Sequence, residues 1–254
     1  MKNPTLDLIH KHGSVRRYKP DPVPASVIET IVAAAQRAST SSNLQAYSVV
    51  AVTDADKRAA LAKLCGGQSH IVQAPVFLAW CADRYRLERA NQMRGYEHNA
   101  ETVENFLVSA VDAAIAAQNA ALAAESMGLG ICYIGSIRND TAGVINLLGL
   151  PKHVFPITGM TIGWPESPPR IRPRLSQEVI LHWESYDIEQ ENALLAYDQA
   201  MIATGIYKDR QVAVPGQEGE MEAYGWLEHT ARRTSQPVRA EMLSIIQKQG
   251  FGMK

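Results

Sequence analysis

The sequence predicts an α+β fold organised around one long helix. An alanine-rich stretch from Glu101 to Met127 contains neither proline nor glycine and therefore favours helix, which Gly128 and Gly130 end. Short apolar runs that suit buried strands lie among longer helical segments. Because these strands do not alternate regularly with helices, we expect an α+β arrangement and not a parallel βαβ sheet.

The long helix would span about 39 Å at roughly 1.5 Å per residue, and its small side chains allow other helices to approach closely. We expect it to be the central spine of the fold. A membrane span is the competing interpretation. Asp112, Gln118, Asn119 and Glu125 interrupt the apolar run, so we expect no membrane span.

The N-terminal region begins with a predicted short helix at residues 5–11, which Gly13 ends. The segment HGSVRRY at residues 12–18 then presents polar groups in an extended or turning backbone. It is the first candidate site.

A second candidate site follows the next helix. Ser26 and Glu29 have the spacing of a capping box and predict a helix over residues 27–38. The polar run at residues 39–45 follows this helix and precedes a strand. It is either a capped loop or a binding loop, and the sequence leaves both open.

The remaining elements are predicted from turn residues, caps and apolar runs. They are, in order, a strand at 47–53, a helix at 55–65 capped by Asp54, a turn at 66–70 that contains Gln68, a strand at 76–82, a charged helix and loop at 83–99, the long helix, a strand at 131–135, a helix from Asn139 or Asp140 to Leu148, a strand at 155–164, an extended proline-rich loop at 164–176, and helices at 188–206 and 225–249 joined by a loop at 207–224. We expect a single domain, residues 1–254, in which residues 177–254 form a C-terminal helical excursion.

The overall composition excludes several classes of protein. The net charge of −1 argues against a general binder of nucleic acid, although residues 10–19 are locally basic. The three cysteines are far apart and form no CxxC pair, which favours a reducing cytoplasm. The N-terminus lacks the apolar core of a signal peptide, so we expect neither export nor anchoring.

Several familiar catalytic motifs are absent, namely GxSxG, HExxH, GxxxxGK[ST] and paired CxxC. The glycines of GLGICYIG follow a helix and precede a strand, which is the reverse of a dinucleotide-binding turn. His10 and His12 lack metal-ligand partners at a useful spacing, so we expect no metal site.

The polar residues that remain suit a phosphorylated ligand rich in amide groups, because guanidinium groups bind phosphate bidentately and hydroxyl groups satisfy its other lone pairs. The candidates are His12, Ser14 and Arg16 at one end, Arg172 and Arg174 at the other, and the neutral side chains of Ser39, Ser41, Ser42, Gln45 and Gln68. No pair of nucleophile and general base is evident, so a cofactor could supply the chemistry. Scattered surface charges are the open alternative.

Several motifs together resemble the FMN-dependent nitroreductase superfamily. They are, in order, HGSVRRY, STSSNLQ, GGQSH, AAIAAQNAALAAESMGLGICYIGSIRN, IGWP, RPRL and a distal segment with Trp226, His229, Arg232 and Arg233. Most similar is the branch of oxygen-insensitive NADPH nitroreductases and flavin reductases. The resemblance covers nearly the whole chain.

The resemblance implies a homodimer with a central, mostly antiparallel sheet surrounded by helices, and with the long helix at the subunit interface. FMN would lie between the protomers. The implied cofactor-binding residues are His12, Ser14, Arg16, Arg172 and Arg174 at the phosphate and ribityl end, Ser39, Ser41, Gln45 and Gln68 at the ribityl chain and ring edge, and Ile134, Gly135 and Ser136 at the isoalloxazine.

The implied reaction is ping-pong. A reduced nicotinamide gives hydride to flavin N5 and leaves, and then a small-molecule acceptor (a nitroaromatic, a quinone or a free flavin) takes the electrons. No side chain is therefore expected to be catalytic in its own right. The alternative from another class is a flavin-binding or redox-sensing protein without turnover.

One departure from the branch concerns the nicotinamide. The loop after the first C-terminal helix carries only Lys208 and Arg210 as bases among the acids Asp209, Glu218, Glu220 and Glu222. Arg232 and Arg233 are further candidates for the 2′-phosphate of NADPH. These bases favour NADPH and the acids oppose it, so NADPH and NADH both stay open as electron donors.

Overall fold

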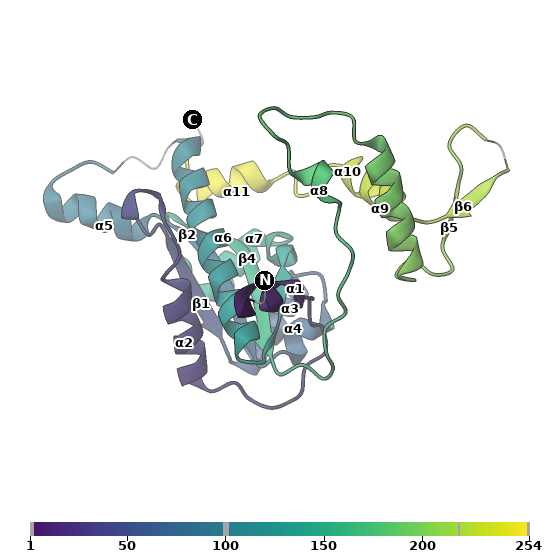
Figure 1. Ribbon diagram of the computed structural model, residues 1–254. Helices are drawn as coiled ribbons and strands as arrows, with labels where there is room; N and C mark the ends of the chain where they lie inside the picture. Colours follow the sequence, from purple (N-terminus) through teal and green to yellow (C-terminus); the bar gives the residue numbers. More distant parts are fainter. Residues whose placement is uncertain (1–2, 99–101, 218, 253–254) are drawn as a thin grey trace. The chain divides into compact units, whose positions relative to one another are not determined.

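The computed structural model describes residues 3–98, 102–217 and 219–252 (Figure 1). The chain forms two compact units. The first unit comprises the residues up to Arg170 together with those from Arg239 onward, and the second comprises Ile171–Val238. The predicted single domain with an excursion at 177–254 depends on how these units assemble, and it stays a prediction.

The first unit contains most of the regular structure. Its elements are α1 (Pro4–His10), α2 (Ala25–Ala35), the 3₁₀-helix η1 (Ser41–Asn43), β1 (Tyr47–Val52), α3 (Ala55–Leu64), α4 (Ser69–Gln73), β2 (Val76–Asp83), α5 (Tyr85–Arg94), α6 (Val103–Ser126), β3 (Gly130–Ile134), the 3₁₀-helix η2 (Gly135–Arg138), α7 (Thr141–Leu148), β4 (Val154–Gly163) and α11 (Met242–Lys248). The second unit contains α8 (Gln177–Ile180), α9 (Glu191–Ala203), β5 (Gln211–Ala213), β6 (Met221–Ala223) and α10 (Trp226–Thr234).

A four-stranded antiparallel sheet is the middle layer of the first unit. Its strand order is β1-β2-β4-β3, so β1 and β3 are the edge strands. Leu78 and Trp80 of β2 pack towards α2 and α6, whereas Phe77 and Ala79 pack towards α3, α4 and α7. Because helices cover both faces, every residue of β2 is buried. The predicted α+β fold with an antiparallel sheet is confirmed.

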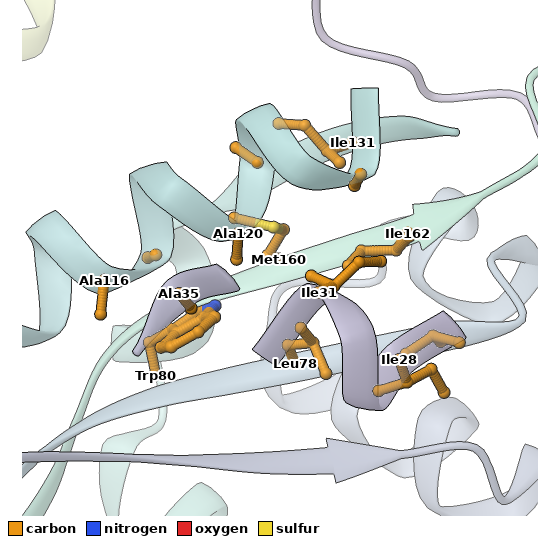
Figure 2. Close-up of a cluster of buried hydrophobic side chains, with 14 of the residues drawn as sticks. Ile28, Ile31, Ala35, Leu78, Trp80, Ala116, Ala120, Ile131, Met160 and Ile162 are labelled. Atoms are coloured by element: carbon orange, nitrogen blue, oxygen red, sulfur yellow. The ribbon is translucent and has the colours of Figure 1, made fainter. Parts of the chain in front are cut away.

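Helix α6 is the predicted spine, and it lies beside α2 on one face of the sheet (Figure 1). Its buried positions are mostly alanines, and Figure 2 shows Ala116 and Ala120 in one cluster with Trp80 and Met160 of the sheet. The helix begins at Val103, with Thr102 as its N-cap; the predicted start at Glu101 lies outside the described residues.

By length and composition alone, α6 could cross a membrane. Its alanine face, however, is filled by α2 and by the sheet, which is the environment of a core helix. Asp112 is also buried on this helix and binds backbone groups of the same unit. The structure therefore supports the interpretation of α6 as a spine.

Two local predictions in the N-terminal half are wrong. Helix α2 begins at Ala25 with Pro24 as the N-cap residue, so Ser26 lies within the first turn and makes no capping box. The carbonyl group of Pro24 instead accepts hydrogen bonds from the backbone of Val27 and Ile28. The predicted turn at 66–70 is shorter, because Gln68 is the N-cap of α4 and Ser69 is already helical.

The C-terminal third departs further from prediction. The helix predicted at 225–249 is broken into α10 and α11 by residues 235–241, where Pro237 lacks an N–H group and Arg239 has a left-handed φ of 57°. The loop predicted at 207–224 contains the β5–β6 hairpin. Helix α9 is shorter than the predicted helix at 188–206.

All three cysteines are free and buried. Burial raises the pKa of the Cys65 thiol to about 11 and that of Cys81 to about 12. It also raises the pKa of Cys132. These thiols therefore stay protonated at neutral pH, and the thiolate is the reactive form.

We expect none of the three thiols to react with Ellman's reagent in the native protein at pH 8, and all three to react in denaturant. The unfolded thiols ionise near pH 8.5, whereas burial raises the pKa of Cys65 to about 11 and that of Cys81 to about 12, so the stability that these two thiols contribute is full below pH 8.5. That stability is lost as the pH rises towards 11, by about 1.4 kcal/mol per pH unit for Cys65 and for Cys81. Rapid labelling of the folded protein at pH 8 would contradict the assignment.

Candidate functional site

The segment from Gly13 to Lys19 begins beside the start of the edge strand β3 and passes to the end of β4. The backbone N–H of Val15 donates to the Ile131 carbonyl at 2.8 Å, and that of Lys19 donates to the Trp164 carbonyl at 2.8 Å. In an extended backbone alternate side chains face opposite sides. Gly13 and Val15 are accordingly buried, while Ser14 and Arg16 are exposed.

Two glycines allow this segment to lie close to its neighbours. A Cβ atom on Gly13 would lie 2.8 Å from the Arg170 carbonyl oxygen, and a Cβ atom on Gly130 would lie 2.5 Å from a methyl group of Val15. From sequence, both glycines were expected only to end helices. The structure shows that they are also needed for close approach.

Tyr18 anchors the end of the segment in the core. Its buried hydroxyl donates to the Val15 carbonyl at 2.8 Å and bonds to Thr161 Oγ1 at 2.8 Å. Burial raises its pKa well above the ordinary value, so this phenol remains a neutral hydrogen bonder. Ser14 and Arg16 thus project from a fixed backbone.

His12 is held by the last turns of α6. Its Nδ1 lies 2.6 Å from Oε1 of Glu125, and the exposed fractions of the two side chains are 31% and 12%. A carboxylate partner at one ring nitrogen fixes the orientation of the imidazole. His12 is therefore an oriented group at the start of the same segment.

Gln68 and Ser136 meet at the end of β3. The Nε2 of Gln68 donates to Ser136 Oγ at 2.9 Å. Ile134 and Gly135 lie directly before Ser136, where β3 passes into η2. Together with the N-terminal segment they make up the β3-edge group, which comprises His12, Ser14, Arg16, Gln68, Ile134, Gly135 and Ser136.

His70, in the first turn of α4, was not predicted from sequence. It is buried, and its Nε2 has no hydrogen-bond partner among the described residues. Burial, together with the positive charge of Arg16, lowers its pKa, so the ring is neutral at pH 7.

The polar run at residues 39–45, here called the serine loop, lies elsewhere. It joins α2 to the edge strand β1, and it is tied to the middle of α6 by Asp112. Ser39 and Ser41 line a cavity of about 410 Å³ beside α6. The other residues that line this cavity are Thr40, Glu104, Leu107, Val108, Val111, Asp112 and Ile115.

The β3-edge group and the serine loop are anchored at separate points of α6. His12 pairs with Glu125, and Ser41 bonds to Asp112. At roughly 1.5 Å per residue, these two anchors are about 20 Å apart along the helix. The structure therefore brings the predicted cofactor-binding residues of the first unit into two groups and not into one.

The predicted phosphate ligands Arg172 and Arg174 belong to the second unit. Both are exposed, and Arg174 Nη1 donates to the Arg172 carbonyl at 3.3 Å. Because the two units are described separately, their meeting with His12, Ser14 and Arg16 stays a prediction.

Two of the candidate bases for the nicotinamide phosphate gather around an aromatic side chain in the second unit. The guanidinium groups of Arg210 and Arg232 lie 5.8 Å and 5.6 Å from the ring centroid of Tyr224. Arg232 also pairs with Glu228. Tyr207 packs edge-to-face nearby, with its ring centroid 5.3 Å from that of Tyr224. This aromatic centre was not predicted from sequence.

Lys208 and Arg233 are exposed and, among the described contacts, do not join this cluster. Of the acids expected to oppose a phosphate, Glu220 and Glu222 are exposed. Glu218 lies outside the described residues.

Metal-binding side chains are not clustered in the part of the chain that the structure describes: no three His, Cys, Asp or Glu residues converge there. The predicted cofactor-binding residues instead have mostly guanidinium, hydroxyl and amide side chains. Such groups suit an organic cofactor with a phosphate.

Comparison with known proteins places the chain in a family. A model described as "Nitroreductase family" matches residues 9–164, and "Nitroreductase family, C-terminal domain" matches residues 172–254. The chain is 36% identical over 255 residues to "FMN reductase (NADPH)" of Bacillus subtilis, with 98% of each chain covered. It is 37% identical over 252 residues to "Oxygen-insensitive NADPH nitroreductase" of Salmonella typhimurium, covering 99% of this chain and 100% of the other.

Comparison with solved structures supports the same family. The NADPH:FMN oxidoreductase of Vibrio harveyi, complexed with NAD⁺, superposes with a TM-score of 0.87 at 34% identity, covering 99% of this chain and 100% of that one. NfrA2 of B. megaterium superposes with a TM-score of 0.91 at 32% identity over all of both chains. Both parts of the chain and its fold therefore lead to one assignment: the chain belongs to the nitroreductase family.

Proposed function

We propose that the chain is an FMN-dependent oxidoreductase that transfers electrons from NAD(P)H to nitroaromatics, quinones or flavins by a ping-pong mechanism. The observation that supports this best is the β3-edge group, where residues far apart in sequence gather around the two ends of β3 and the last turn of α6. Relatives named as NADPH-dependent flavin reductases and nitroreductases support the same reaction.

The residues present fit FMN. Arg16 and Ser14 supply a guanidinium and a hydroxyl on the exposed side of a fixed segment, and His12 is oriented beside them. Gln68 and Ser136 supply neutral hydrogen-bonding groups near the end of β3. This order suits a phosphate at one end of a ligand and an amide-rich ring at the other.

Bound FMN would supply the redox chemistry, by accepting hydride from a reduced nicotinamide and passing two electrons to the acceptor. The side chains of the chain would bind, orient and provide the electrostatic field. Arg16 would favour the negative charge of the phosphate, and the amide of Gln68 would favour negative charge at the ring edge. The latter is preorganised electrostatic stabilisation without proton transfer by a side chain. The neutral His70 adds no positive charge at pH 7.

We further propose a homodimer with α6 at the interface. The anchors of the β3-edge group and of the serine loop are about 20 Å apart on one α6, so a second copy offers a way to bring both groups to one flavin. Leu107, Val111 and Ile115 of α6 are 51%, 52% and 40% exposed and line the cavity beside the serine loop. A second copy would cover this apolar surface. The working compartment would be the cytoplasm.

The direct test is purification followed by flavin analysis, light scattering and an acceptor panel with both nicotinamides. We expect one FMN per chain, a mass of twice 27.9 kDa, and consumption of NAD(P)H that depends on an acceptor. A yellow protein that oxidises neither nicotinamide would favour a flavin-binding protein without turnover. A colourless protein that cannot be reconstituted, or an active monomer that retains flavin, would contradict the flavin site or the dimer respectively.

Charge at the phosphate should dominate flavin retention. We expect Arg16→Ala combined with Arg174→Ala to weaken FMN binding by about ten- to a hundredfold for each arginine removed, because a hydrogen bond to a charged group contributes roughly 1.5–3 kcal/mol. Riboflavin, which lacks the phosphate, should bind the variant and the wild type equally. Arg17→Ala is the matched control, since Arg17 is an exposed neighbouring arginine. Unchanged FMN affinity in the double variant would refute the anchoring role.

Arg210 should set the preference for NADPH. We expect Arg210→Ala to lower the ratio of kcat/KM for NADPH to that for NADH by about ten- to a hundredfold, because the variant has no guanidinium at this position to bind the 2′-phosphate. The kcat/KM for NADH should hardly change. Glu222→Gln is the opposite control, because Glu222 is an exposed acid of β6, which pairs with β5 directly after Arg210, and its removal should raise the ratio. A wild type that prefers NADH, or an unchanged ratio in Arg210→Ala, would rule out this role.

A further inference from the structure

Asp112 is a buried carboxylate whose role the proposed reaction does not explain. It lies in the middle of the alanine-rich α6 and is only 1% exposed. Aspartate is a poor helix former and the burial of a charge costs free energy, so this residue does not stabilise the helix itself. Its hydrogen bonds show which segment of the chain it stabilises instead.

Both carboxylate oxygens accept hydrogen bonds from the serine loop and its flank. The backbone N–H of Ser41 donates to Oδ1 at 3.0 Å, and that of Ala46 donates to Oδ2 at 3.0 Å. These two donors bracket the part of the loop that contains Ser42, Asn43 and Gln45. Among the described residues no lysine, arginine or histidine forms an ion pair with Asp112, so the loop itself compensates the charge.

The bracketed segment has a backbone that would not persist without support. Ser42, Asn43 and Gln45 have left-handed φ values of 47°, 56° and 52°, which non-glycine residues seldom adopt. Such a conformation persists only where the surroundings over-determine it. Arg86 Nη1 donates to the Gln45 carbonyl at 3.0 Å, and Asp112 bonds the backbone at both ends of the segment, so the bonds of Asp112 help to hold Ser41 and Gln45 in their exposed positions.

We propose that Asp112 is a positioning residue for flavin binding, which holds the serine loop so that Ser39, Ser41 and Gln45 present their side chains to the ribityl chain and ring edge of FMN. This inference rests on the proposed function. Asp112 also lines the cavity beside the loop, so its carboxylate adjoins the surface that the loop presents.

The first test is Asp112→Asn. An asparagine keeps the size of the side chain but offers only one acceptor oxygen, so one of the two backbone donors is left without a partner. We expect peptides that cover residues 39–46 to exchange amide hydrogen faster, while those from β2 keep their protection. Affinity for FMN should fall by about ten- to a hundredfold, the effect of one charged hydrogen bond.

The ratio of FMN to riboflavin affinity distinguishes this role from others. Because the serine loop is assigned to the ribityl chain and ring, Asp112→Asn should weaken FMN and riboflavin by the same factor, whereas Arg16→Ala should weaken FMN alone. Asp54→Asn is the matched control: Asp54 also accepts a backbone N–H, from Lys57 at 2.8 Å, but it caps α3 outside the site. It should leave both affinities unchanged.

A second pair of variants covers the case in which Asp112→Asn does not fold. Ser41→Pro removes the N–H donor and Ser41→Ala removes only the hydroxyl. Proline suits this position because Ser41 opens a 3₁₀-helix after an extended Thr40, with φ −134° and ψ 151°. Weaker binding of both flavins in Ser41→Pro than in Ser41→Ala would support the inference.

The failure of the proposed function and the failure of this inference give different results. A wild type that binds no flavin overturns the proposed function and this inference with it. A wild type that binds FMN, beside an Asp112→Asn or a Ser41→Pro with unchanged flavin affinities relative to its control, overturns the inference alone. So does a selective loss of FMN over riboflavin in Asp112→Asn, since that would assign the residue to the phosphate end.

Discussion

The packing of the alanine face of α6 against the sheet and α2 is the constraint on which the rest of the first unit depends. Ala116, Ala117 and Ala120 are fully buried, and the small side chains leave room for Trp80 of β2 (Figure 2). Larger side chains would overpack this contact, at a cost of about 1–3 kcal/mol per site. The close approach also fixes where the polar residues of α6 lie, because the helix can be buried along only one face.

That fixed helix carries two polar anchors, and each holds one part of the candidate site. Glu125 holds His12, and Asp112 holds the serine loop. The anchoring groups are carboxylates, which accept several hydrogen bonds and can therefore order backbone or imidazole donors at short range. The spine thus both builds the core and sets the spacing of the binding groups. This spacing is the reason that a second copy of the chain enters the proposed function.

Prediction from sequence succeeded where local signals and core packing agree. The strand that became β2 was evident because a strand covered on both faces is apolar throughout, and Asp54 was evident as a cap because its side chain bonds within the next turn. It failed at 225–249, where the local helical pattern was overruled at Pro237. It also missed His70 and Tyr224, because an isolated histidine or tyrosine has no periodic or motif signal.

The sequence by itself determined the α+β class, the spine, the order of the strands along the chain and the chemical types of the binding residues, since all of these follow from composition, periodicity and short motifs. Only the tertiary structure decided which of those residues meet. Gln68 reaches Ser136 and Asp112 reaches Ala46 across long stretches of chain. Such contacts depend on strand order and helix packing, which arise from the burial of many side chains at once and leave no signal at any single position.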